Sequence, residues 1–206
     1  IGAGPSGLSC AYFLARLGYR PTVFEAEQRP GGMLVQTIPS YRLPREIVAR
    51  EIRMIERLGV TILTGKKLGR DFTITSLRDD GYEAIFIGVG APKGETLDLP
   101  GGSAEGVTDA MTFLRDYNIK GSVPVGEKVA IVGGGNAAMD AARTAIRLGA
   151  KTVTIVYRRT IEDMPAYMEE IEEALNEGVI IRALTNPDEI LVANGKVSGV
   201  KCHSMK

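Results

Sequence analysis

The stretch VAIVGGGNAAMDAARTAIRLGAKTVTIVYRR, residues 129–159, decides the fold of this chain. Its first four residues, 129–132, form an apolar run that predicts a buried strand, and a glycine loop follows directly. Residues 139–148 then predict a helix, and the apolar run over 153–157 predicts a second strand. A strand, a glycine loop, a helix and a further strand make up a βαβ unit with the fingerprint of dinucleotide-binding domains.

Each small residue of this loop has a physical reason. Gly133 permits the tight turn, Gly135 lets the backbone approach a pyrophosphate, and Ala138 is small enough for the helix to pack on the strand. Asn136 and Ala137 lead into the predicted helix, whose amino end supplies free N–H groups and the positive end of the helix dipole to the anion. We therefore expect these five residues to bind a dinucleotide.

The same unit occurs at the start of the chain, in GAGPSGLSCAYFLARLGYRPTVFE, residues 2–25. A shift of 131 positions aligns six of its residues with the second copy: Gly2, Gly4, Ala11, Arg16, Leu17 and Gly18 fall on Gly133, Gly135, Ala142, Arg147, Leu148 and Gly149. The expected loop residues are Gly2, Gly4, Pro5, Ser6 and Gly7, followed by a helix over 8–17 and a strand over 22–24. Because only Ile1 precedes the loop, we expect the chain to lack most of the strand that supports it.

The two copies differ at the end of the second strand, where a side chain of this fold contacts the ribose of the bound nucleotide. Glu25 stands 23 positions after Gly2, beside Ala26, and its carboxylate suits the hydroxyls of an unphosphorylated ribose. At that edge of the second copy stand Arg158 and Arg159, which suit a 2′-phosphate because they donate charge-assisted hydrogen bonds. This difference predicts FAD at the first loop and NADPH at the second.

Together with the remaining elements, the two units predict an α/β fold with two Rossmann-like dinucleotide-binding domains. We expect helices over 44–58, 109–117 and 165–177, strands over 60–63, 84–87 and 179–183, a linker over 119–127, and a hairpin around Asn194-Gly195 within 190–201.

Composition removes several kinds of chemistry. Lysine plus arginine and aspartate plus glutamate number 25 each, so no surface for nucleic acid or for a membrane is indicated. No apolar run reaches the roughly 20 residues of a membrane span, and no signal peptide is recognisable, so a cytoplasmic location is expected. The two cysteines, Cys10 and Cys202, form no CxxC pair, and His203 is the single histidine. No metal site is expected, and the hard chemistry must come from a bound cofactor.

Four runs of the sequence resemble a known family. Residues 132–140 (VGGGNAAMD), 156–159 (VYRR) and 164–166 (MPA) look like the NADPH domain of the glutamate synthase small (beta) subunit family. The run from Gly31-Gly32-Met33 to residues 38–44 (IPSYRLP) is similar to the family's flavin-side segment. The family also includes the NADPH subunit of ferredoxin-dependent transhydrogenases and the N-terminal half of dihydropyrimidine dehydrogenase, and the resemblance covers nearly the whole chain.

The resemblance implies a function and further site residues. NADPH would deliver hydride to FAD, whose electrons pass to iron–sulfur clusters of a large catalytic subunit or a fused domain. Five more residues would belong to the FAD site: Gly32, Met33, Arg42, Leu68 and Gly90. The family inserts its NADPH domain into its FAD domain. This predicts a partial FAD-binding domain over 1–118 and a partial NADPH-binding domain over 119–206, truncated at both ends.

Other readings remain open at this point. One is another flavoprotein with two dinucleotide sites, such as a transhydrogenase subunit, a flavin monooxygenase or a disulfide reductase. Another is a non-catalytic nucleotide-binding fragment. The missing CxxC disfavours a disulfide reductase, and the run over 38–44 disfavours a monooxygenase.

Overall fold

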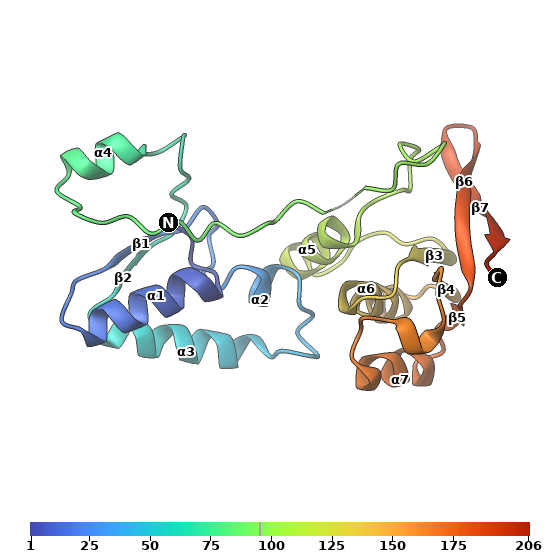
Figure 1. Cartoon of the computed structure of the whole chain (residues 1–206), viewed down its shortest axis with the longest axis horizontal. Coiled ribbons are helices and arrows are strands. Elements are labelled where there is room, and N and C mark those ends of the chain that lie inside the picture. Colours follow the sequence, from blue (N-terminus) through green and yellow to red (C-terminus); the bar gives the residue numbers. More distant parts are fainter. Residues whose placement is uncertain (95) are drawn as a thin grey trace. The chain divides into compact units, whose positions relative to one another are not determined.

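The computed structural model describes residues 1–94 and 96–206, which form two compact units, Ile1–Pro92 and Lys93–Lys206. Figure 1 shows both units. The boundary lies earlier in the chain than the expected division at residues 118 and 119, because the helix over 110–120 packs with the second unit. The assignment of residues 1–118 and 119–206 to two cofactors stays a prediction.

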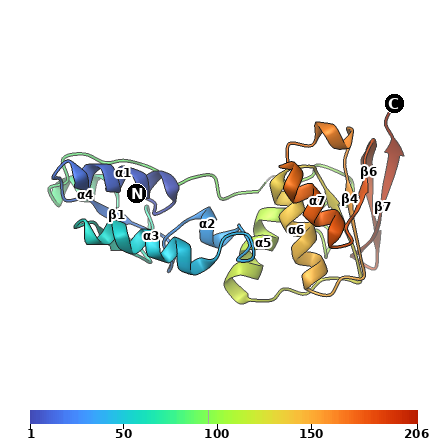
Figure 2. The same ribbon diagram turned by 90° about the horizontal axis from the view of Figure 1, so that it is seen from below.

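The first unit contains α1 (Pro5–Arg16), β1 (Thr22–Phe24), α2 (Met33–Gln36), α3 (Arg45–Arg57), β2 (Thr61–Leu63) and α4 (Ile74–Asp79). Strands β1 and β2 pair in parallel, with Val23 opposite Ile62. Helices α1 and α3 lie side by side (Figures 1 and 2) and bury their apolar faces in a core of Ala3, Leu8, Ala11, Val23, Val48, Ile52 and Val60. This core fixes the glycine loop at the carboxyl end of β1.

The strand expected over 84–87 is wrong for the described structure, where these residues have no regular assignment. They nevertheless run beside the first residue of the chain. The Ile1 amino group donates to the Phe86 carbonyl (2.7 Å), and the Gly88 N–H donates to the Ile1 carbonyl (2.8 Å). A ladder needs two strands, and the neighbour here is a single residue long.

The second unit contains α5 (Ala110–Lys120), β3 (Lys128–Val132), α6 (Asn136–Arg147), β4 (Thr152–Val156), a 3-10 turn (Ile161–Asp163), α7 (Met168–Asn176), β5 (Ile180–Arg182), β6 (Thr185–Ala193) and β7 (Lys196–Ser204). Strands β3, β4 and β5 form a parallel sheet in that order. Helices α6 and α7 cover one face, over a core that includes Met139, Val153, Ile155 and Ile171, while β6 and β7 form an antiparallel hairpin beside the sheet (Figure 2).

The internal repeat is confirmed by the helix bounds. Helix α1 covers residues 5–16 and α6 covers 136–147, the same offset of 131 that the sequence shows. Both helices begin three residues before the expected start, directly after Gly4 and Gly135. The glycines that follow them, Gly18 and Gly149, have φ of 90° and 97°, which glycine adopts without steric cost at a helix end.

Other expected elements differ mainly at their ends. The hairpin around Asn194-Gly195 is confirmed, with φ of 52° and 79° in its turn, and its strands extend further than expected. Helix α5 extends to Lys120, so the expected linker begins later. The helix expected from Pro165 begins at Met168, because residue 166 is held by the second glycine loop. Short helices α2 and α4 have no counterpart among the expected elements.

Candidate nucleotide-binding sites

The first glycine loop is held between β1 and the turn at residues 30–32. The Gly2 N–H donates to the Phe24 carbonyl (2.8 Å), and the Gly31 N–H donates to the Ala3 carbonyl (2.7 Å). Gly2 has φ of 98°, which a residue with a Cβ adopts only under strain. These hydrogen bonds fix the backbone conformation of the loop, and that conformation requires a glycine at position 2.

The close approaches at this loop leave no room for side chains. A Cβ at Gly7 would overlap the Gly2 carbonyl oxygen, and one at Gly32 would lie 2.8 Å from the Gly4 Cα. The first approach is the helix-to-strand packing that the third glycine of the fingerprint serves. The second approach brings the backbone of Gly32 against the loop. Gly32 therefore lies beside the predicted loop residues, which are Gly2, Gly4, Pro5, Ser6 and Gly7.

The amino end of α1 is open to a ligand. Its N-cap residue is Gly4, no side chain caps the helix, and Pro5 occupies the first helical position. Pro5 and Ser6 are exposed, whereas Gly7 and Leu8 are buried. Uncapped N–H groups at the positive end of a helix dipole bind phosphate, and this loop therefore fits a pyrophosphate.

Glu25 has an additional role that the sequence does not reveal. It is only 6% exposed, and its Oε2 accepts a hydrogen bond from the Ala3 N–H (2.6 Å), while Oε1 accepts one from the Glu27 N–H (2.8 Å). The predicted ribose ligand therefore also ties the glycine loop to the end of β1. Each carboxylate oxygen can accept a second hydrogen bond, so these contacts leave acceptor capacity for a ribose. Its neighbour Ala26 is exposed.

The segment that follows Gly32 is fixed by an arginine that sequence reasoning missed. Arg45 donates to the carbonyls of Leu34 (2.6 Å) and Ile38 (2.6 Å) from the start of α3. These bonds hold the segment that carries the predicted Met33 and Arg42 against α3. Met33 begins α2, and the Arg42 N–H donates to a backbone carbonyl in the same segment. The only signal for Arg45 in the sequence is its position directly after Pro44.

Leu68 and Gly90 lie on two other segments of the first unit. The segment of Leu68 runs past the end of β1, because the Lys66 N–H donates to the Glu25 carbonyl (2.7 Å). A Cβ at Gly88 would lie 3.3 Å from the Gly7 nitrogen, so the segment leading to Gly90 approaches the glycine loop. The structure thus brings both segments to the carboxyl end of β1, where a dinucleotide is expected.

The second glycine loop has the same plan. The Gly133 N–H donates to the Val156 carbonyl (3.1 Å), and Gly133 has φ of 132°. Gly135 is the N-cap of α6, again without a side-chain cap, and a Cβ there would meet nothing within 4 Å. The amino end of α6, where Asn136 and Ala137 are the first two residues, therefore has room beside its N-cap and no side chain bonded to its N–H groups. Ala138 is buried in the core, as a small residue at the third position should be.

Arg158 and Arg159 follow β4 at the same edge of the sheet. Both residues are exposed, and the backbone between them and β6 is fixed, because the Leu184 N–H donates to the Arg159 carbonyl (2.9 Å). Two guanidinium groups on an anchored backbone beside a glycine loop can donate to a 2′-phosphate. The predicted residues of the second site are therefore close to one another along β3, β4 and α6.

A segment over residues 163–167 covers the second loop. The Ala166 N–H donates to the Gly134 carbonyl (3.1 Å), and the Tyr167 N–H donates to Asn136 Oδ1 (3.0 Å). Tyr157 joins the same group, since its hydroxyl donates to the Asp163 carbonyl (2.7 Å). From the sequence, residues 164–166 only resembled the glutamate synthase small subunit family, and no contact with the glycine loop was predicted for them.

An ionic cluster joins α6 to α7 behind the second loop. The buried Arg143 pairs with Glu170 (2.9 Å), Glu173 (3.1 Å) and Glu177 (2.8 Å). Arg147 also pairs with Glu177 (2.7 Å). The Arg147 hydrogen bond, assisted by Arg143 and opposed by burial, holds the pKa of Glu177 below its ordinary value. The cluster fixes α6, the helix whose amino end follows the second glycine loop.

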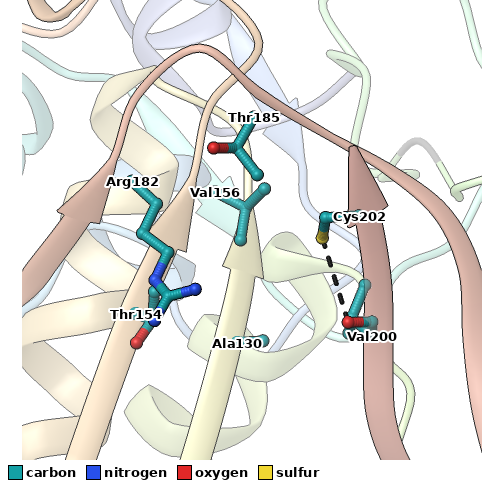
Figure 3. Close-up of a pocket in the computed structure, with 7 residues that line it drawn as sticks. All are labelled: Ala130, Thr154, Val156, Arg182, Thr185, Val200 and Cys202. Carbon is teal, nitrogen blue, oxygen red and sulfur yellow. Dashed lines mark hydrogen bonds between the residues drawn. The ribbon is translucent and has the colours of Figure 1, made fainter. Parts of the chain in front are cut away.

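A pocket of about 400 Å³ lies elsewhere, between the sheet of the second unit and its hairpin (Figure 3). Its lining residues are Ala130, Thr154, Val156, Arg182, Thr185, Val200 and Cys202. None of the predicted site residues lines it. Within residues 1–94 and 96–206 no group of three possible metal ligands occurs, and no helix there is long and apolar enough to cross a membrane. Cys10 and Cys202 are free thiols in different units.

Comparison with known proteins decides the family. The family model described as pyridine nucleotide-disulphide oxidoreductase matches residues 1–204. The chain belongs to this family. The family assignment confirms the predicted oxidoreductase class, and at the level of the family it confirms FAD and NADPH as cofactors.

Curated relatives confirm the resemblance to glutamate synthase small subunits. The chain is 46% identical to the NADP(+)-dependent formate dehydrogenase subunit beta of Moorella thermoacetica, matching 100% of this chain and 29% of that protein. It is 38% identical to the glutamate synthase [NADPH] small chain of Escherichia coli, over 98% of this chain and 45% of that one. The chain thus spans less than half the length of these relatives.

Solved structures confirm the α/β fold class of the family. FprA from Mycobacterium tuberculosis in complex with NADPH superposes with a TM-score of 0.82 at 17% identity, over 98% of this chain and 62% of that one. Lactococcus lactis thioredoxin reductase superposes with a TM-score of 0.71 at 23% identity, over 100% of this chain and 70% of that one. At these identities the likeness establishes the fold alone.

Proposed function

We propose that this chain is the nucleotide-binding part of an NADPH-dependent flavin oxidoreductase, with FAD at the first glycine loop and NADPH at the second. One observation carries the proposal. Two loops of the same design end in opposite charges at the ribose edge, the Glu25 carboxylate in one and the guanidinium groups of Arg158 and Arg159 in the other. Two identical nicotinamide sites would need no such difference.

The proposed FAD site draws on five segments of the first unit. The uncapped amino end of α1 and the residues around Gly4 would hold the pyrophosphate, and Glu25 would accept the ribose hydroxyls. Met33 and Arg42 would line the FAD site, the backbone at Leu68 would meet the adenine, and Gly90 would belong to the Gly-rich segment that closes the flavin domain. When bound, FAD supplies a group that accepts a hydride and releases electrons one at a time.

The NADPH site is assembled at the carboxyl edge of β3 and β4. The amino end of α6 at Gly135, Asn136 and Ala137 would hold the pyrophosphate. Arg158 and Arg159 would hold the 2′-phosphate that distinguishes NADPH from NADH. Support for this site comes from the open space at Gly135 and from the exposure of both arginines.

We further propose that the electrons leave through iron–sulfur clusters of a fused domain or a separate large subunit. Relatives named as subunits of formate dehydrogenase and of an NADPH-Fe(3+) oxidoreductase support an assembly of this kind. The chain spans 29% and 31% of these two relatives, which leaves length for such domains. A cytoplasmic location stays part of the proposal.

The proposal is tested by cofactor content and electron output. The full-length protein should release stoichiometric FAD on heating and should reduce a one-electron acceptor such as ferricyanide with NADPH as the donor. Flavin-free protein that still binds NADPH tightly would contradict the FAD assignment. A flavoprotein that reduces a disulfide substrate but no one-electron acceptor would contradict the proposed electron path.

A further inference from the structure

Tyr157 lies between the two parts of the second site. It is the first residue after β4 and directly precedes Arg158. Its own backbone is paired on both sides, since its N–H donates to the Arg182 carbonyl (3.0 Å) and its carbonyl accepts from the Thr185 N–H (2.9 Å). The backbone that leads into the arginine pair is therefore fixed to β5 and β6.

The ring of Tyr157 meets the phosphate loop. A Cβ on Gly134 would lie 2.7 Å from Tyr157 Cε2 and 2.8 Å from its Cδ2, and 3.1 Å from Met164 Cγ. These distances are closer than van der Waals contact allows, so position 134 must lack a side chain for the ring to lie there. This explains the middle glycine of Gly133-Gly134-Gly135, which the dinucleotide fingerprint itself leaves free.

The hydroxyl of Tyr157 completes a closed set of contacts. It donates to the Asp163 carbonyl, and Asp163 Oδ2 accepts from the Thr160 hydroxyl (2.9 Å), so the turn after the arginines is held at both ends. Residues 166 and 167 then bond back to Gly134 and Asn136. The arginine turn, the covering segment and the phosphate loop are thus connected through one side chain.

We infer that Tyr157 is a positioning residue that sets Arg158 and Arg159 against the phosphate loop and thereby determines the preference for a 2′-phosphorylated nucleotide. The inference rests on the proposed NADPH site. Tyr157 itself donates to no part of the nucleotide. Its effect passes through the backbone of the arginine turn, because recognition of pyrophosphate and 2′-phosphate together requires a fixed spacing between the loop and the guanidinium groups.

The variant Tyr157→Phe separates this role from a merely structural one. Phenylalanine keeps the ring on Gly134 and removes only the bond to Asp163. We expect calorimetry on the full chain to show NADPH binding weakened about three- to ten-fold, the range for one neutral hydrogen bond, and NADH binding unchanged. The control Tyr19→Phe removes a hydroxyl from an exposed position in the first unit and should change neither affinity. Equal loss for both nucleotides, or no loss, would overturn the inference.

A double-mutant cycle tests the route of the effect. In an Arg158→Ala/Arg159→Ala background, Tyr157→Phe should weaken NADPH binding no further, because the residues through which it acts are gone. An additive loss would overturn the inference. If the arginine variant keeps its NADPH preference, the proposed site and this inference both fall. If the arginines matter and Tyr157→Phe leaves the preference intact, only the inference falls.

Discussion

The two glycine loops share a design and differ in what supports them. Helices α1 and α6 have the same length and an offset of 131 residues, and each begins after a glycine without a side-chain cap. The second loop follows the five-residue strand β3, which pairs fully with β4. In the first loop the buried carboxylate of Glu25 binds the loop backbone directly.

Because of this difference, residues of the first loop should affect both nucleotide binding and protein stability, whereas the arginine pair should affect nucleotide binding alone. Glu25 is buried and satisfies backbone N–H groups, so its loss affects both the loop and any nucleotide on it. Arg158 and Arg159 are exposed beside an anchored backbone, so their loss affects the nucleotide alone. Variants in the two units should therefore differ in whether they change nucleotide affinity, stability or both.

The largest expected effect comes from removing the arginine pair. Each charge-assisted contact to the 2′-phosphate contributes about 1.5–3 kcal/mol, so Arg158→Ala/Arg159→Ala should weaken NADPH binding about 100-fold or more. NADH binding and the melting temperature should change little. Titration calorimetry with both nucleotides measures the effect, and an equal loss for NADPH and NADH would remove the assignment of the second loop.

Two glycine substitutions, one in each loop, should differ in their effect on stability. Gly7→Ala places a Cβ on the Gly2 carbonyl oxygen and should lower the free energy of unfolding of the first unit by about 1–3 kcal/mol. Gly135→Ala meets open space, so it should leave stability unchanged while weakening NADPH binding, because the pyrophosphate needs that space. Urea unfolding and calorimetry check both. A destabilised Gly135→Ala variant would show that the two loops are closer in design than we conclude.

Replacing the carboxylate should affect flavin and stability together. Glu25→Gln keeps one acceptor oxygen and removes the charge that strengthens the bonds to Ala3 and Glu27. We expect a loss of about 1–3 kcal/mol in unfolding free energy and a lower flavin content, with NADPH binding intact. Flavin absorbance per protein and urea unfolding are the measurements. Normal flavin content in this variant would argue against Glu25 as the ribose ligand.

The smallest effect is a pH dependence confined to the second unit. Because the pKa of Glu177 is held below its ordinary value of 4.5, its carboxylate stabilises the fold above that pH, and this contribution is lost as the pH falls below it. The pair is partly exposed, so we expect less than about 1 kcal/mol. Arg147→Ala removes the main cause of the lowered pKa. In this variant the free energy of unfolding, measured by urea at several pH values, should fall less steeply below about pH 4.5. An unchanged slope would assign the dependence to other carboxylates.

The sequence predicted the elements that depend on local rules. Glycine position and apolar periodicity placed α1, α6 and β1, and the 131-residue offset predicted the repeat that the helix bounds confirm. The carboxyl edge of each sheet, which carries Glu25 in the first unit and the arginines in the second, also follows from the order of strand, loop and helix. These features need only neighbours in the chain or the known chirality of the βαβ unit.

What could not be predicted depends on contacts between distant segments. The Ala3 N–H donates to the Glu25 carboxylate 22 positions later in the chain, a contact for which neither residue gives a local signal. The N–H of residue 166 donates to the Gly134 carbonyl, so this residue does not join α7. The sequence signals for a helix start are local and cannot show this contact. The run over 84–87 has the pattern of a strand, and its only ladder partner in the described chain is Ile1.

The central claim is that the two loops bind different nucleotides and that electrons pass from the second to the first. Anaerobic mixing of the full flavin-containing protein with NADPH or NADH, followed by the visible absorbance of the flavin, tests it most directly. We expect rapid bleaching by NADPH and much slower bleaching by NADH at equal concentration. Equal rates for the two nucleotides, or a flavin that neither reduces, would contradict it.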